Sequence, residues 1–246
     1  MRLVYVLLGL LPVLHPVVSH AAAPRTNFVL CMTDDQGWGD TGYNGNPVLR
    51  TPHLDAMAAA GVRFDRFYAA YPVCSPTRGS VLTGRNPSRY RSRSWGYDLP
   101  LREVTVAEVL RAAGYATGHF GKWHLGGVPN ADGITGRGVP ESFDSAPRHP
   151  GNQGFDVWFT AGNWFDADPP AGTFWRNGAP VPALRGDTSD LVMAEALGFI
   201  RARARAGQPF LGVVWFPSPH GPWRALPADR APYASQGEHA DFLGEM

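Results

Sequence analysis

The chain has 246 residues, enough for one sizeable α/β domain with a hydrophobic core of its own. Apolar residues make up 44% of it, with 8 Trp and 13 Phe, which argues against an intrinsically disordered chain. The formal net charge of +1 gives no basic footprint for a nucleic-acid partner. The 29 Gly and 23 Pro predict long ordered loops over a compact scaffold.

The N-terminal residues have the pattern of an export signal. Arg2 supplies a positive start, an apolar stretch runs from residue 3 to about residue 18, and small residues follow. We therefore expect residues 1–21 to be a signal peptide, with cleavage as late as Ala23. The alternative is a membrane anchor, but the apolar run is short and is interrupted by a His-Pro pair. The expected location is periplasmic or secreted, with no stable membrane span once the signal is removed.

After the signal, short apolar runs alternate with segments that carry helix start and stop signals. Thr51-Pro52 opens a helix that Gly61 closes, and Thr105 with Glu108 forms a capping box for a later helix. In chain order, the pattern predicts strands over 27–32, 62–69, 115–121, 155–160 and 210–216, and helices over 53–60, 76–84, 105–114 and 187–206.

Strands that alternate with helices predict an α/β fold in which a mainly parallel sheet has helices on both faces. Ligands of such sheets bind beyond the carboxyl ends of the strands. Charged and imidazole side chains follow three of the predicted strands at that edge, namely Asp34, Asp35, Lys122, His124 and His220. We therefore expect these side chains to converge on one functional site.

The pair Asp34-Asp35 offers four carboxylate oxygens at a strand end. Two adjacent like charges repel each other, so the pair is costly unless a cation lies between them. Oxygen-only ligation suits a hard ion such as calcium or magnesium. The alternative is a solvated acidic turn without a metal.

Cys74 precedes a predicted helix start, where backbone N–H groups and the helix dipole stabilise negative charge. Arg78 lies one turn further on and can pair with an anionic oxygen. Two alternatives remain open for Cys74. It can be a buried structural thiol, or it can form a disulfide with Cys31, the other cysteine of the chain.

Four motifs together resemble the sulfatase family, in that family's order. Residues 74–84 carry Cys-x-Pro-x-Arg followed by Thr-Gly, and residues 114–126 carry Gly-Tyr-x-Thr leading to Gly-Lys-Trp-His-Leu-Gly. Residues 34–40 match the family's opening metal motif, and residues 218–222 resemble its next histidine loop. The resemblance implies an alkaline phosphatase-like fold, with residues 24–246 as the N-terminal portion of a sulfatase catalytic domain.

The resemblance also implies sulfuric ester hydrolysis through formylglycine, made from Cys74 by a formylglycine-generating or anaerobic sulfatase-maturating enzyme. The aldehyde hydrates to a geminal diol, one hydroxyl attacks the sulfur, and the alcohol leaves. The second hydroxyl then loses its proton, which expels sulfate and regenerates the aldehyde. Covalent catalysis thus divides one difficult displacement into two easier steps.

Site roles follow from the same resemblance. Asp34, Asp35 and an oxygen of modified Cys74 would hold calcium, with magnesium less favoured. Arg78 would orient the diol, Lys122 would bind a sulfate oxygen, His124 would assist collapse of the diol, and His220 would contact sulfate or protonate the leaving oxygen. The two histidine roles are interchangeable at this level. Independently of the family, Lys122 is the single lysine among 22 Lys and Arg residues, which favours a site that needs a compact ammonium.

Two parts of the family pattern are missing, a later Asp-Asn pair that completes the metal site and a second lysine. The sequence contains neither and ends at Met246, soon after the His220 loop. We therefore expect a chain truncated at its C-terminus, with half of a calcium site and an exposed sheet edge, and low or absent activity of this polypeptide alone.

Two other functions remain open. The same scaffold can serve a phosphate or phosphonate ester hydrolase, because sulfate and phosphate differ little in shape. A chain that keeps the anion pocket without the metal can instead be a non-catalytic binder of sulfated glycans. For the enzyme, the expected substrate is a sulfated small molecule or glycan.

Overall fold

The structure is a computed structural model that describes residues 25–128, 148–164 and 166–246. The expected signal peptide over residues 1–21, with cleavage as late as Ala23, lies outside the described residues. Within the described part of the chain, no helix combines the length and the apolar character needed to cross a membrane.

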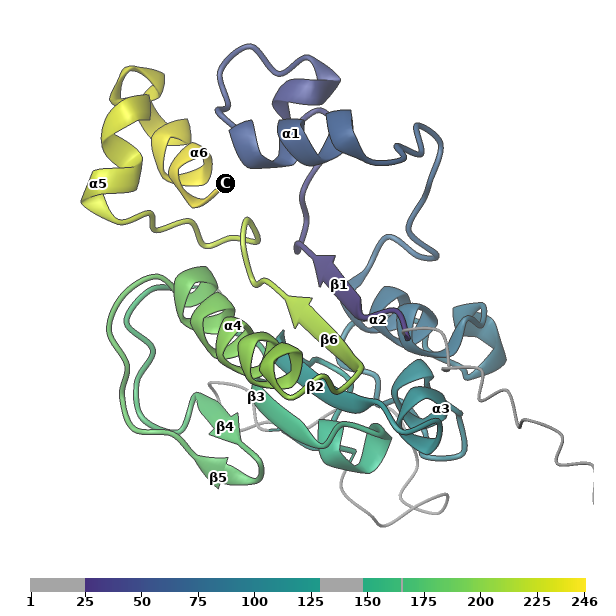
Figure 1. The fold of residues 1–246 in the computed structure, drawn as a ribbon. Helices are drawn as coiled ribbons and strands as arrows, with labels where there is room; N and C mark the ends of the chain where they lie inside the picture. The colour runs from purple at the N-terminus through teal and green to yellow at the C-terminus, as the bar shows by residue number, and fades with distance from the viewer. Residues whose placement is uncertain (1–24, 129–147, 165) are drawn as a thin grey trace, which may run out of the picture.

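A six-stranded sheet forms the centre of the described chain (Figure 1). In spatial order its strands are β1 (Phe28–Met32), β6 (Phe210–Trp215), β2 (Ala116–Lys122), β3 (Val157–Ala161), β4 (Phe174–Arg176) and β5 (Ala179–Pro180). The first three pairings are parallel and the last two are antiparallel. The mainly parallel sheet is confirmed, and the unpredicted β4 and β5 are too short to produce a sequence pattern.

The helices follow the predicted order. They are α1 (Pro52–Ala60), α2 (Cys74–Thr83), α3 (Val106–Ala112), α4 (Thr188–Arg205), α5 (Pro227–Arg230) and α6 (Ala240–Glu245), with short 3-10 turns between some of them. The predicted capping box is present at the start of α3, where Thr105 and Glu108 each accept a hydrogen bond from the other's backbone N–H. Helix α2 begins at Cys74, two residues earlier than predicted.

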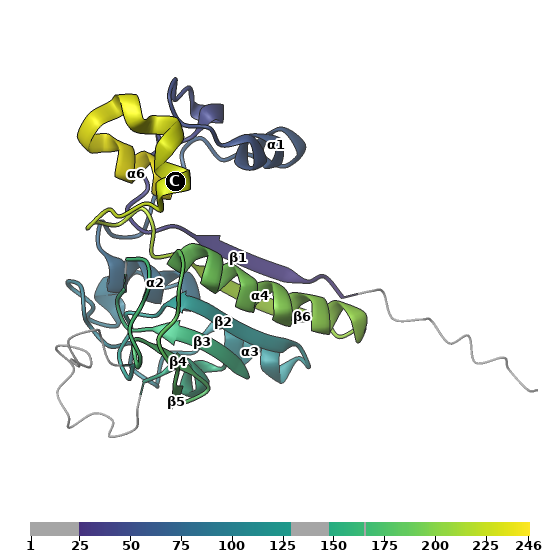
Figure 2. The same ribbon diagram turned by 90° about the vertical axis from the view of Figure 1, so that its left-hand side faces the viewer.

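The two faces of the sheet carry different helices. Along β6, Leu211, Val213 and Trp215 belong to one core cluster, which includes side chains of α2 and α3. Phe210 and Val214 belong to a second cluster with side chains of α4. Because side chains alternate across a strand, the two clusters lie on opposite faces. Figure 2 shows α4 and α3 on the two sides of the sheet, which confirms the layered α/β fold.

Close approach between β2 and β6 depends on Gly121. This residue has φ of 103°, and a Cβ at this position would lie 1.9 Å from the carbonyl oxygen of Trp215. No side chain fits there without separating the strands. Gly121 directly precedes Lys122, so the tight pairing also determines where the end of β2 presents its lysine.

The predicted strand over residues 62–69 is wrong. The segment forms bends and turns, and its large apolar side chains lie in solvent, with Phe64 73% and Phe67 83% exposed. A strand needs a neighbour to satisfy its backbone groups and cover its side chains, and none of the described residues pairs with this segment. Strand β1 lies at the edge of the sheet, because among the described residues it pairs with β6 alone.

Candidate active site

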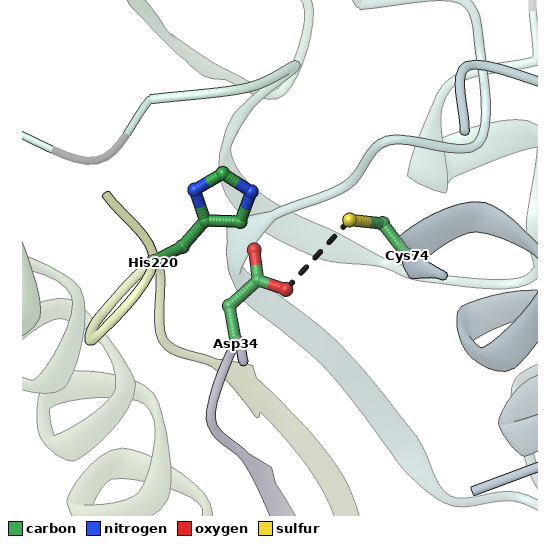
Figure 3. A group of neighbouring side chains, drawn as sticks. All are labelled: Asp34, Cys74 and His220. Carbon is green, nitrogen blue, oxygen red and sulfur yellow. Dashed lines mark hydrogen bonds between the residues drawn. The ribbon is translucent and has the colours of Figure 1, made fainter. Parts of the chain in front are cut away.

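The carboxyl ends of three parallel strands bring the candidate residues together. Asp34 and Asp35 follow β1, Lys122 ends β2 with His124 two residues later, and His220 follows β6, while Cys74 and Arg78 come from α2. The segments beyond β1 and β6 are joined by a hydrogen bond from the Asp34 N–H to the Ser218 carbonyl oxygen at 3.1 Å. Figure 3 shows the side chains of Asp34, Cys74 and His220 around one point.

Asp34 is buried and lies at the centre of this group. Its Oδ2 accepts a hydrogen bond from Lys122 Nζ and lies 3.4 Å from an Arg78 guanidinium nitrogen, while its Oδ1 accepts from Cys74 Sγ at 3.8 Å. Burial acts to raise the pKa of Asp34, but the positive charges of Arg78 and Lys122 outweigh it and lower the pKa. Asp34 is therefore ionised and held by two buried cations.

Cys74 is the first residue of α2 and faces a pocket of about 400 Å³ whose lining includes Asp34, Asp35 and Arg78. Lys122 Nζ lies 3.4 Å from its Sγ. Burial acts to raise the pKa of the thiol, but the hydrogen bond with His220 and the charge of Lys122 outweigh it, so the pKa is lowered. Both cysteines are free, so the disulfide with Cys31 is not formed.

Arg78 contacts the group through the Asp34 carboxylate and the backbone of Lys122. Its guanidinium lies 4.9 Å from the centre of the Trp215 ring and donates a hydrogen bond to the Lys122 carbonyl oxygen at 3.0 Å. The ring, the carbonyl and Asp34 thus hold a planar cation from three directions. This arrangement connects α2 with the ends of β2 and β6.

Lys122 lies between Asp34 and Cys74 and is fully buried as a side chain. Burial and the charge of Arg78 lower its pKa, while Asp34 and Cys74 oppose that change. A compact ammonium fits between a carboxylate and a sulfur atom where a guanidinium fork would not, which gives the single lysine of the chain a physical reason.

His124 is buried with φ of 50°, and within the described residues neither of its ring nitrogens has a hydrogen-bond partner. Burial, together with the charges of Lys122 and Arg78, lowers its pKa to about 3, so the ring is neutral. A buried polar group without a partner is costly to fold. The ring is therefore suited to receive a hydrogen bond from a ligand or from a modified residue 74.

His220 also contacts Cys74, through a side-chain hydrogen bond. Its Nδ1 lies 2.6 Å from the Gly221 carbonyl oxygen, so Nδ1 carries a proton, and its Nε2 lies 3.5 Å from Asp35 Oδ2. The hydrogen bond with Cys74 raises the pKa of His220, which burial opposes. The side chain of Asp35 is 65% exposed, so this acid is held far less firmly than Asp34.

Three side chains could together hold a metal ion, because ligand atoms of Asp34, Cys74 and His220 lie within 4.8 Å of one another. The carboxylate suits a hard cation, whereas a thiolate and an imidazole suit softer metals. Calcium therefore fits this donor set better if an oxygen replaces the sulfur of Cys74. The predicted ligand Asp35 does not belong to this group, although its Oδ2 lies 3.5 Å from His220 Nε2.

Two residues beside Cys74 were not singled out from the sequence. Ser75 is fully buried, and its Oγ donates a hydrogen bond to the His124 carbonyl oxygen at 2.7 Å and accepts one from the Gly96 N–H at 2.8 Å. Trp95 packs its ring against His124. Ser75 occupies a variable position of the Cys-x-Pro-x-Arg motif, so the motif predicts roles for Cys74 and Arg78 but not for Ser75. Nothing in the sequence around Trp95 indicates a site.

Comparisons of the sequence with family models and with curated proteins agree with each other. The family model described as Sulfatase matches residues 26–241. N-acetylgalactosamine-6-sulfatase of Rattus norvegicus is 34% identical over 96% of this chain and 45% of its own length. The chain thus spans less than half the length of that relative.

Solved structures give the same fold. The structure of BT4656 in complex with its substrate D-glucosamine-2-N,6-O-disulfate is 26% identical, with a TM-score of 0.69 over 86% of this chain and 38% of that one. A protein in the alkaline phosphatase superfamily from Vibrio parahaemolyticus is 20% identical, with a TM-score of 0.54 over 90% of this chain and 47% of that one. The expected alkaline phosphatase-like fold is confirmed.

Proposed function

Because this chain belongs to the sulfatase family, we propose that it carries the nucleophile and the anion-binding half of a sulfuric ester hydrolase. One observation carries the proposal. Cys74, at the first residue of α2, opens into a pocket of about 400 Å³ with its Sγ 3.4 Å from Lys122 Nζ and 3.8 Å from Asp34 Oδ1. An anionic ester placed there meets positive charge and a helix N-terminus.

The proposed nucleophile is formylglycine, made from Cys74 by a formylglycine-generating or anaerobic sulfatase-maturating enzyme. Its hydrated aldehyde would supply a hydroxyl that attacks sulfur and a second hydroxyl that later expels sulfate. Lys122 binds a sulfate oxygen, and Arg78 keeps residue 74 and Lys122 in register through its contacts with Trp215 and the Lys122 carbonyl. Both cations are already buried, so little reorganisation is needed when charge develops on the sulfate oxygens.

The two histidines receive separate roles from their contacts. His124, whose ring nitrogens have no partner among the described residues, accepts a hydrogen bond from residue 74 and takes up its proton. His220 contacts Cys74 and Asp35, and its Nδ1 proton stays on the Gly221 carbonyl oxygen. Its raised pKa favours the imidazolium, whose Nε2–H is then the proton given to the leaving oxygen.

The proposed metal is calcium, held by Asp34, Asp35 and an oxygen of modified residue 74, and it would neutralise the sulfate and polarise its oxygens. These are few oxygens for calcium, which takes 6–8 ligands in proteins. We therefore propose weak calcium binding and low turnover for the 246-residue chain alone. Its substrate would be a sulfated small molecule or glycan, met in the periplasm or after secretion.

The test uses the full chain produced together with a formylglycine-generating enzyme. Mass spectrometry of the peptide that holds residue 74 should show the aldehyde. Turnover of a chromogenic aryl sulfate should be low, stimulated by calcium, and lost in Cys74→Ala, with Cys31→Ala as the matched control that keeps it. An unmodified thiol, or turnover that survives Cys74→Ala, would contradict the nucleophile. Turnover of a matched phosphate ester in place of the sulfate ester would favour the phosphohydrolase.

A further inference from the structure

One large aromatic side chain stands at the candidate active site without belonging to the core. The Trp95 ring contacts the His124 ring, with centroids 6.3 Å apart and planes tilted by 35°. Trp95 is 46% exposed and belongs to neither core cluster, although Tyr90 and Leu99 of the same segment are buried in one of them. The indole thus lies against a candidate catalytic residue on one side and solvent on the other.

Hydrogen bonds connect the residue after Trp95 with the residue after Cys74. The N–H of Gly96 donates to Ser75 Oγ at 2.8 Å, and Ser75 Oγ donates to the His124 carbonyl oxygen at 2.7 Å. Residues next to Trp95, next to Cys74 and at His124 thus meet at one buried hydroxyl group. The backbone segments that carry Cys74, Trp95 and His124 are thus connected through Ser75.

The rest of the segment is attached to the loop that follows β2. The N–H of Leu99 donates to the Leu125 carbonyl oxygen at 3.0 Å, and Asp98 forms an ion pair with Arg148 at 3.3 Å. Before Trp95, Tyr90 is buried in the core and its hydroxyl donates a hydrogen bond to the Pro76 carbonyl oxygen. The segment is therefore attached before and after Trp95, and the exposure of the ring does not come from a loose surface loop. A rigidly held, half-exposed ring is a ready platform for another flat or ring-shaped group.

We propose that Trp95 is a specificity-determining residue that stacks on the ring bearing the sulfate ester, which rests on the proposed function. The Lys122 and Cys74 groups bind the sulfate, and they leave the alcohol part of the ester to be recognised by its own surface. A sugar ring offers a face of C–H groups and an aryl ring offers a π face, and an indole stacks on either. A flexible alkyl sulfate offers neither, so the substrate class is ring sulfates.

The experiment measures dissociation constants for the full chain by calorimetry, which does not depend on turnover. The probes are 4-nitrophenyl sulfate, a monosaccharide 6-sulfate, ethyl sulfate and inorganic sulfate. The variants are Trp95→Ala and Trp95→Phe. The matched control is Phe67→Ala, which removes an exposed aromatic ring that lines a different pocket.

Trp95→Ala should weaken binding of at least one ring sulfate about tenfold, the order expected for loss of one stacked aromatic pair. Trp95→Phe should retain most of the affinity. Ethyl sulfate and inorganic sulfate should bind both variants as they bind the wild type, and Phe67→Ala should change nothing. A loss confined to the aryl ester or to the sugar sulfate would identify which ring is stacked.

Two results would overturn the inference, and they differ in what else they overturn. If the wild type binds ring sulfates and Trp95→Ala binds them equally well, or loses inorganic sulfate to the same extent, stacking is wrong while sulfate ester recognition stands. If the wild type binds none of the four probes, the proposed function fails and this inference fails with it.

Discussion

Adjacent acids on the two sides of the Cys74 pocket experience different environments. On the paired side, Asp34 is buried against Lys122 and Arg78. We use the term open flank for Asp35 and the nearby exposed segment 62–68, most of which lines a second pocket. There the Asp35 side chain is 65% exposed and apolar rings lie in solvent. Contacts among the described residues therefore hold Asp34 in place. The apolar rings of the open flank are not covered by any of the described residues.

The difference predicts where the chain tolerates change. A buried charge depends on its partners, because removing one partner leaves the other charge desolvated. An exposed charge loses little when its partner is removed, because water replaces it. Substitutions of the same chemical type should thus have large effects on the paired side and small effects on the open flank.

The largest effect is expected for Asp34→Ala. The change leaves Lys122 and Arg78 buried without their carboxylate, which should lower the free energy of unfolding by about 3–5 kcal/mol. Urea denaturation followed by circular dichroism measures it. Asp35→Ala is the matched control and should change stability by less than about 1 kcal/mol. Equal losses for the two neighbours would show that the two sides do not differ.

A second comparison uses two arginines. Arg78→Lys removes the stacking on Trp215 and the fork that reaches both Asp34 and the Lys122 carbonyl, and should cost about 2 kcal/mol. Arg63→Lys changes an arginine of the open flank, which pairs with Asp65 at 2.8 Å in solvent, and should cost under about 0.5 kcal/mol. Thermal unfolding of both variants measures the two losses of stability. Equal losses would contradict the prediction that burial makes Arg78 the more important residue.

Calcium should distinguish the two sides further, because its binding should depend on Asp35 of the open flank. At a concentration a few times its dissociation constant, calcium should stabilise the matured chain by about 1 kcal/mol, seen as a higher Tm that a chelator reverses. Asp35→Asn should abolish the shift while leaving the calcium-free Tm unchanged. Asp65→Asn, an exposed acid outside the Cys74 pocket lining, should keep the shift. A shift that survives Asp35→Asn would place the ion elsewhere.

The smallest effect on stability is expected on the apolar surface of the open flank. Phe67→Ser replaces a ring that is 83% exposed, so the free energy of unfolding should change by under about 0.5 kcal/mol. Binding of a hydrophobic dye and self-association in sedimentation should both decrease, because exposed apolar patches drive association. A strong loss of stability would mean that the ring is covered in solution.

Most of the scaffold could be predicted from sequence because its signals are local. Strands 28–32 and 210–215 are apolar runs, although only the second is buried in the structure. The capping box at Thr105 is a four-residue pattern, and helix α4 begins at its Asp187 cap. The segment 62–69 has the same local pattern as the strands. It differs because no described strand lies beside it, and a pairing partner is not a local property.

The sequence by itself determined the chemistry available to this protein: which acids, imidazoles, thiol and ammonium follow the strand ends, and the family to which their motifs belong. The tertiary structure decided how those groups differ. It buried Asp34 and exposed Asp35, joined Ser75 to the backbone at His124 and Gly96, and set Trp95 against His124. The physical reason is that burial and partnership depend on which distant segments pack together, and β6 brings the ends of β1 and β2 into reach only by pairing between them.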